Sequence, residues 1–251
     1  RVQVFTNATL AHFAGYIGNF KTTLRVGSDG REQNIEHGVT IVATGGEELK
    51  PKEYLYGEDP RVLTQLEMES LLHGDRRRAE GLKEVVMIQC VGSRNEERPY
   101  CSRVCCAEAV KNALSLKALN PKAQVSILYR DMRMYSHLEE DYARARKAGI
   151  RFLRYEEDRK PEVARKDGRL EVSFFNPVLR ESLTLQPDLL VLSAATLPAD
   201  TAGLASMLIC FEMVHMDRFV DATVDWNYEP TRRGQEWLAK NFATQSAGTG
   251  H

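Results

Sequence analysis

The fold of this chain follows from residues 84–129, which read EVVMIQCVGSRNEERPYCSRVCCAEAVKNALSLKALNPKAQVSILY. Residues 84–89 are a short and mostly apolar run, typical of a strand buried on both faces of a parallel sheet. Residues 106–119 carry apolar side chains at helical spacing, and Asn120-Pro121 stops that helix. Because residues 124–129 are a second apolar run, the stretch predicts a strand, a cysteine-rich loop, a helix and a strand.

The same alternation continues downstream. We expect a charged helix over residues 138–148 and strands over residues 150–155 and 189–193, with a hairpin over residues 163–175 between them. This order favours a doubly wound α/β domain with an antiparallel insertion, spanning residues 81–199.

Residues 1–80 predict a partial domain of a related type. Strands are expected over residues 2–5 and 22–26, and a helix over residues 64–72. Residues 38–46, GVTIVATGG, form an apolar β-branched run that ends in glycines, as in a buried parallel strand that leads into a tight loop. A similar apolar strand ends in Ala-Ala-Thr in the second half, which suggests two related nucleotide-binding-type domains.

The composition is that of an ordinary globular protein. The 251 residues include 34 Lys+Arg and 35 Asp+Glu, so the charge balance gives no general attraction to nucleic acid or to a membrane surface. We find neither a signal peptide nor an apolar run long enough to span a bilayer, and clustered cysteines favour a cytoplasmic, reducing setting. The chain starts at Arg1 and is expected to be a piece of a longer polypeptide, with residues 200–251 as a divergent C-terminal segment.

Four of the five cysteines lie in one short stretch, with the spacing C-x10-C-x3-C-C. They are Cys90, Cys101, Cys105 and Cys106. Thiolates at this density predict a metal site that holds zinc or an iron–sulfur cluster, although a thiol redox role and inert buried cysteines stay open. The vicinal pair and the long spacer fit a zinc site poorly. Positive charge in the same loop, at Arg94, Arg98 and Arg103, would offset an anionic cluster.

The usual dinucleotide-binding loop is missing after the strand at residues 84–89. Cysteines stand where the pattern G-x-G-x-x-G would cradle a pyrophosphate, so this half is expected to carry a metal site in place of a nucleotide. The segment Ala43-Thr44-Gly45-Gly46 is either a simple glycine turn or a backbone approach to a flavin dinucleotide.

Several segments together resemble the A subunit of heterodisulfide reductase and its relatives, including subunits of quinone-interacting oxidoreductase complexes. They are residues 86–121 around the cysteines, ILYRDMRMY at 127–135, and residues 6–25, 41–51 and 62–69. The resemblance implies a thioredoxin-reductase-like flavoprotein core that binds FAD at Ala43, Thr44, Gly45 and Gly46. It also implies a [4Fe–4S] cluster on Cys90, Cys101, Cys105 and Cys106.

The resemblance further implies an oxidoreductase subunit that passes electrons between FAD and iron–sulfur clusters. Such proteins sit in multi-subunit complexes with other iron–sulfur subunits, where homodimerisation is also expected, and they neither bind nucleic acid nor insert into membranes. Two alternatives stay open. One is a pyridine-nucleotide-dependent thiol/disulfide reductase that uses Cys105 or Cys106, and the other is a zinc-stabilised interaction module.

Overall fold

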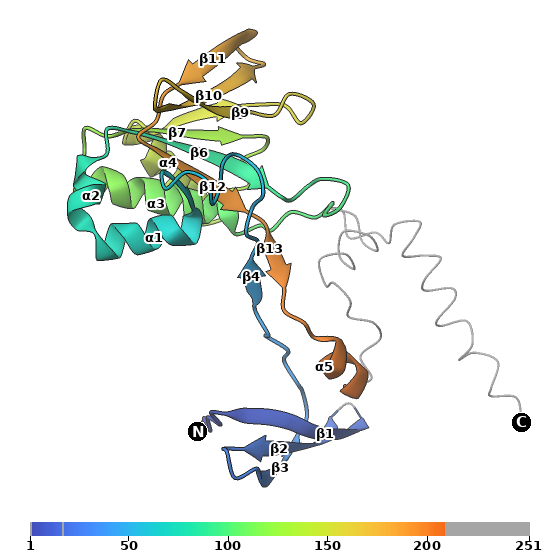
Figure 1. Cartoon of the computed structure of the whole chain (residues 1–251). Helices are drawn as coiled ribbons and strands as arrows, with labels where there is room; N and C mark the ends of the chain where they lie inside the picture. Colours follow the sequence, from blue (N-terminus) through green and yellow to red (C-terminus); the bar gives the residue numbers. More distant parts are fainter. Residues whose placement is uncertain (1, 17, 209–251) are drawn as a thin grey trace, which may run out of the picture. The chain divides into compact units, whose positions relative to one another are not determined.

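The structure is a computed structural model that describes residues 2–16 and 18–208. The chain divides into two compact units (Figure 1). Unit 1 comprises Arg1–Glu47 and Pro198–His251, and unit 2 comprises Glu48–Leu197. Unit 2 holds all four of the cysteines at positions 90–106.

A five-stranded parallel sheet forms the centre of unit 2. Its strand order is β5-β12-β6-β7-β8, and every neighbouring pair is parallel. Side chains on both faces of the central strand are fully buried, which is why the strand reads as a continuous apolar run. The strands are β5 (Val62–Thr64), β6 (Glu84–Val91), β7 (Gln124–Tyr129), β8 (Arg151–Arg154) and β12 (Leu189–Ala194).

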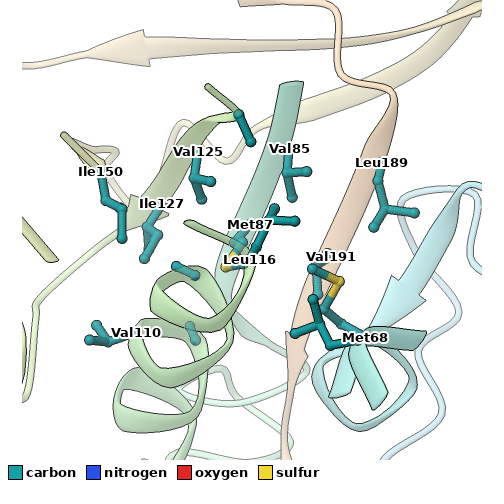
Figure 2. Packing of buried hydrophobic residues seen from close by; sticks show 14 of the residues in the cluster. Met68, Val85, Met87, Val110, Leu116, Val125, Ile127, Ile150, Leu189 and Val191 are labelled. Carbon is teal, nitrogen blue, oxygen red and sulfur yellow. The ribbon is translucent and has the colours of Figure 1, made fainter. Parts of the chain in front are cut away.

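Helices cover one face of this sheet (Figure 1). Apolar side chains of α1 and α3 pack against the strands, with Met68 close to Val191 and with Val110 and Leu116 facing Met87 and its neighbours (Figure 2). The helices are α1 (Gln65–Gly74), α2 (Arg76–Gly81), α3 (Cys105–Leu119) and α4 (Leu138–Lys147).

An antiparallel sheet covers the other face. Its order is β11-β10-β9, and Leu170, Val172 and Phe174 of the central strand pack into a core with Val86 and Ile88 of β6. The strands are β9 (Glu162–Lys166), β10 (Arg169–Asn176) and β11 (Glu181–Leu185). The predicted α/β class with an antiparallel insertion is confirmed, and the insertion has a third strand that the sequence did not predict.

Unit 1 contains a three-stranded antiparallel meander, β1 (Ala8–Tyr16), β2 (Asn19–Val26) and β3 (Arg31–His37), together with α5 (Ala202–Met207). A separate two-stranded sheet pairs β4 (Gly46–Glu48) with β13 (Thr196–Pro198). The strand expected over residues 22–26 lies within β2, whereas residues 2–5 form no strand.

The prediction of a buried parallel strand over residues 38–46 is wrong for this structure. Residues 38–45 have no regular secondary structure, and Val39 and Ile41 are 74% and 88% exposed. A strand requires neighbours for its backbone N–H and C=O groups, and no described strand pairs with this run.

The division into units also differs from the expected boundary near residue 80. Strand β5 and helix α1 lie in unit 2, because β5 is the edge strand beside β12. At the start of α1, Thr64 and Glu67 form a capping box, with the Glu67 carboxylate 2.9 Å from the Thr64 nitrogen. The described residues contain no helix long and apolar enough to cross a membrane. Residues 209–251, most of the predicted C-terminal segment, lie outside the described residues.

Candidate functional site

A β-bulge at the end of β6 presents the first cysteine. Gln89 and Cys90 stand opposite Ser193 alone, since the register with β12 shifts between Ile88 and Val91. Cys90 has a φ of +62°, a left-handed conformation that residues other than glycine rarely adopt. The Tyr155 hydroxyl donates a hydrogen bond to the Gln89 carbonyl at 2.7 Å, and this bond holds the end of β6 in place.

The loop between β6 and α3 is ordered by its own hydrogen bonds. Arg94 N donates to the Tyr100 carbonyl at 3.1 Å, and Arg98 N donates to Asn95 Oδ1 at 2.7 Å. The loop is also tied to the start of β13, where Thr196 N donates to Ser102 Oγ at 2.9 Å. These bonds place Cys101 close to the start of α3.

Helix α3 begins at the vicinal cysteines. Its first residues are Cys105 and Cys106, and the N-cap position, Val104, has no side-chain capping bond. The free backbone N–H groups of a helix N-terminus favour negative charge, so thiolates are stabilised at this position. The Arg103 backbone N–H points at the Cys101 sulfur at 3.4 Å.

All four cysteines of the predicted set are free thiols in the described structure. Cys101, Cys105 and Cys106 are buried, and Cys90 is partly buried. Burial raises the pKa of Cys90, and Cys106 and Cys101 raise it further, whereas Arg94 opposes them. The pKa of Cys105 is also raised, first by its hydrogen bond with Cys106 and then by burial.

Cys106 is the thiol whose pKa is lowered, to about 7. The hydrogen bond from Cys105 is the main cause, and the Arg133 backbone N–H adds to it, while burial opposes the shift. The sequence did not predict a part for Arg133. The signal available was its position just after Tyr129-Arg130-Asp131, at the carboxyl end of β7.

The positive charges of the loop have different partners. Arg94 Nη1 lies 4.0 Å from Cys90 Sγ, and Arg94 Nη2 lies 2.6 Å from Asp131 Oδ2. Arg98 instead pairs with Glu97 at 2.7 Å and donates to the Gly92 carbonyl. Arg94 therefore brings a guanidinium to the first cysteine, whereas Arg98 contacts Glu97 and the Gly92 carbonyl instead.

The donor set fits a thiolate-bound group. Four soft sulfur ligands suit zinc or an iron–sulfur cluster. Next to Cys90, the Gln89 side chain is fully buried, and neither its Nε2 nor its Oε1 has a partner in the described structure, so a bound group could satisfy it. Within residues 2–16 and 18–208, no three Cys, His, Asp or Glu side chains are placed so as to hold a metal ion. The ligand role of the cysteines is therefore a prediction.

The residues predicted to approach a flavin lie in unit 1. All four of these residues, Ala43, Thr44, Gly45 and Gly46, are exposed to solvent. Gly46 is the first residue of β4. Ala43 and Thr44 line a cavity of about 690 Å³ whose other lining residues include Phe13, Thr22, Leu24, Ile35 and His37. Gly45 has a φ of +73°, and a Cβ atom added there would meet nothing within 4 Å, so the space beside its backbone is open.

No protein-family model matches the chain. The A subunit of the H2/formate:CoB–CoM heterodisulfide,ferredoxin reductase of Methanococcus maripaludis is 40% identical over 200 residues, which cover 71% of this chain and 30% of that protein. The iron-sulfur A subunit of the CoB–CoM heterodisulfide reductase of Methanocaldococcus jannaschii is 36% identical over 197 residues, 70% of this chain and 29% of that protein. The chain thus spans about 30% of the length of these relatives.

Two solved structures are distantly similar. The FAD-bound cadaverine monooxygenase of Erwinia amylovora has a TM-score of 0.43 at 11% identity, covering 90% of this chain and 60% of that chain. A thioredoxin reductase of T. acidophilum has a TM-score of 0.39 at 13% identity, covering 78% of this chain and 54% of that chain.

The curated relatives agree with one another in name and in the share of the chain that they match. Four of them, from four organisms, are 36–40% identical over 68–71% of this chain, and each is named as the A subunit of a heterodisulfide reductase. The resemblance found from the sequence segments is confirmed, and the chain belongs to the family of heterodisulfide reductase A subunits.

Proposed function

We propose that this chain is part of a flavin- and [4Fe–4S]-dependent oxidoreductase subunit that passes electrons between FAD and iron–sulfur clusters in a heterodisulfide-reductase-like complex. One observation carries the proposal. Four free cysteines lie at the end of β6, in the loop that follows it and at the start of α3; three of them are buried, and Cys105 and Cys106 are joined by a hydrogen bond. A tetrathiolate set of this kind is the usual ligand set of a [4Fe–4S] cluster.

Cys90, Cys101, Cys105 and Cys106 would hold the cluster. When bound, it would supply one-electron oxidation and reduction. The residues of this chain would position and stabilise the ligands. The β-bulge would orient Cys90, and Arg94 would add a positive charge beside it. The N-terminus of α3 and the Arg133 N–H would stabilise negatively charged sulfur. Burial of three of the four thiols keeps water away, which tunes a cluster potential.

Ala43 to Gly46 would approach FAD. The open backbone at Gly45 and the cavity beside Ala43 and Thr44 support this role. Under this proposal, unit 1 contributes to flavin binding and unit 2 carries the cluster. The partners would be other iron–sulfur subunits, with homodimerisation within the complex, in a cytoplasmic setting that keeps the clustered thiols reduced.

Serine substitutions test the ligand assignment. Cys101→Ser and Cys105→Ser should each remove most of the iron from anaerobically purified protein, whereas Cys210→Ser should leave it unchanged. Cys210 is a matched control because it is the one cysteine outside the sequence cluster. Iron content at the wild-type level in both test variants would contradict the assignment.

One observation favours a thiol/disulfide reductase as the second candidate. Cys106 has a pKa lowered to about 7 and a thiol neighbour, as a reactive cysteine requires. Against this, Cys106 is buried, so a disulfide substrate has no direct access to it. Iron-free protein that reduces an artificial disulfide, with the activity lost in Cys106→Ser, would establish this alternative in place of the cluster.

A further inference from the structure

Arg94 links the cysteine loop to the neighbouring strand of the sheet. Its Nη1 lies 4.0 Å from Cys90 Sγ, and its Nη2 makes a 2.6 Å ion pair with Asp131, the second residue after β7. Its backbone carbonyl accepts a 3.0 Å hydrogen bond from Arg130 Nη1. The Arg94 side chain is 18% exposed and that of Asp131 is 52% exposed.

Asp131 stands at a position with a recognised use in this kind of fold. In dinucleotide-binding domains, an acidic residue near the end of the second strand binds the cofactor ribose. Here β6 is the first strand and β7 the second strand of the unit that α3 connects, and the Asp131 carboxylate is already paired with the guanidinium of the cysteine loop. The carboxylate at the position that usually binds a ribose is therefore bound by an arginine of the same chain.

We infer that Arg94, oriented by Asp131, is a positioning residue that holds Cys90 in place and sets the reduction potential of the group bound there. The inference rests on the proposed function. It follows from the geometry: one guanidinium joins the strand end, the loop and the next strand, and a planar fork can hold two partners at once. A fixed positive charge beside a sulfur ligand favours the more negative, reduced form.

The test compares Arg94→Gln with Arg98→Gln. The two changes remove the same charge from the same loop at nearly the same exposure, 18% and 20%. Each arginine has a carboxylate partner, Asp131 or Glu97, but of the two only Arg94 contacts a cysteine sulfur. Redox titration of the loaded protein should show Arg94→Gln shifted about tenfold toward the oxidised form, or about 59 mV for a one-electron couple. Arg98→Gln should stay near the wild type. Equal potentials in Arg94→Gln and the wild type would overturn the inference.

A second measurement, on iron-free protein, tests the positioning role of Arg94 separately from the proposed binding of a cluster. Hydrogen exchange across residues 91–104 should become faster in Arg94→Gln and in Asp131→Asn, but not in Arg98→Gln, because the first two break the link to β7. Unchanged exchange in both would contradict the positioning role even if the protein binds iron. Failure of the proposed function would instead show itself as wild-type protein without iron and sulfide.

Discussion

The Tyr155 hydroxyl lies 2.7 Å from the carbonyl oxygen of Gln89, the residue that precedes the first cysteine of the cluster. Tyr155 is buried, and burial raises its pKa, so it remains a neutral donor over the range in which proteins are folded. A bulged strand end with an unpaired glutamine side chain is therefore secured by a residue that follows β8.

Tyr155→Phe should destabilise the protein. The change removes a buried donor and leaves the Gln89 carbonyl without this bond, which costs about 1–2 kcal/mol. Urea unfolding measures the effect. Tyr135→Phe is the control, since Tyr135 is 57% exposed and should change stability little. Equal unfolding midpoints for Tyr155→Phe and the wild type would remove the role assigned to this bond.

Gly92→Ala tests the conformation of the cysteine loop. Gly92 has a φ of +73°, and an added Cβ would lie 2.3 Å from the Leu49 Cδ2 atom. The left-handed backbone alone costs a non-glycine residue about 1–2 kcal/mol, while the Leu49 side chain can move aside. Gly81→Ala is the control, because Gly81 is helical and nothing lies within 4 Å of its Cβ position. Thermal unfolding should show loss of stability for Gly92→Ala alone.

Asp59→Asn should weaken the dependence of the free energy of unfolding on pH at acid pH. The buried Asp59 carboxylate accepts hydrogen bonds from Arg61, at 2.8–2.9 Å, and from Arg165 at 3.0 Å, and the bonds from Arg61 hold its pKa well below the usual range. Since the folded pKa is depressed, this stabilisation is complete above the unfolded pKa, about 4, and is lost as the pH falls below it.

Removing the carboxylate therefore costs most at neutral pH. We expect about 2 kcal/mol at pH 7, less than for a fully buried pair because the two arginines are partly exposed. The difference between Asp59→Asn and the wild type should shrink as the pH falls from about 4 toward about 2, as measured by urea unfolding at each pH. A difference that stays constant across this range would show that ionisation of Asp59 is not the cause.

Gly45→Val tests the flavin proposal. A side chain at Gly45 would occupy the open space beside the backbone and should lower the flavin content of the full-length protein several-fold. Gly57→Val carries the same backbone strain, at a φ of +79° with nothing within 4 Å, but lies in unit 2. Absorbance of released flavin per chain gives the comparison, and similar losses in both variants would assign the effect to strain.

The parallel strands could be predicted from sequence because burial on both faces leaves an apolar run, as at Val85, Val86, Met87 and Ile88 of β6. The same rule led to the wrong result for residues 38–46. There the run is also apolar, but no described strand pairs with residues 38–45, and a sequence window carries no information on neighbours.

The four cysteines could be singled out as candidate ligands from the sequence because they are close together in it. The ion pair of Arg94 with Asp131 could not, since the residues are 37 positions apart and meet only when β7 lies beside β6. The same holds for the Arg133 N–H at Cys106 and for Tyr155 at Gln89. Tertiary placement, rather than residue type, decides these contacts.

The proposed function depends above all on the binding of a [4Fe–4S] cluster by the four cysteines. Iron, acid-labile sulfide and zinc, measured on one sample of anaerobically purified protein, give the most direct test. We expect about four irons and four sulfides per site, with little zinc. Stoichiometric zinc without sulfide, or neither metal after attempted reconstitution, would contradict the proposal and return the cysteines to a structural or thiol role.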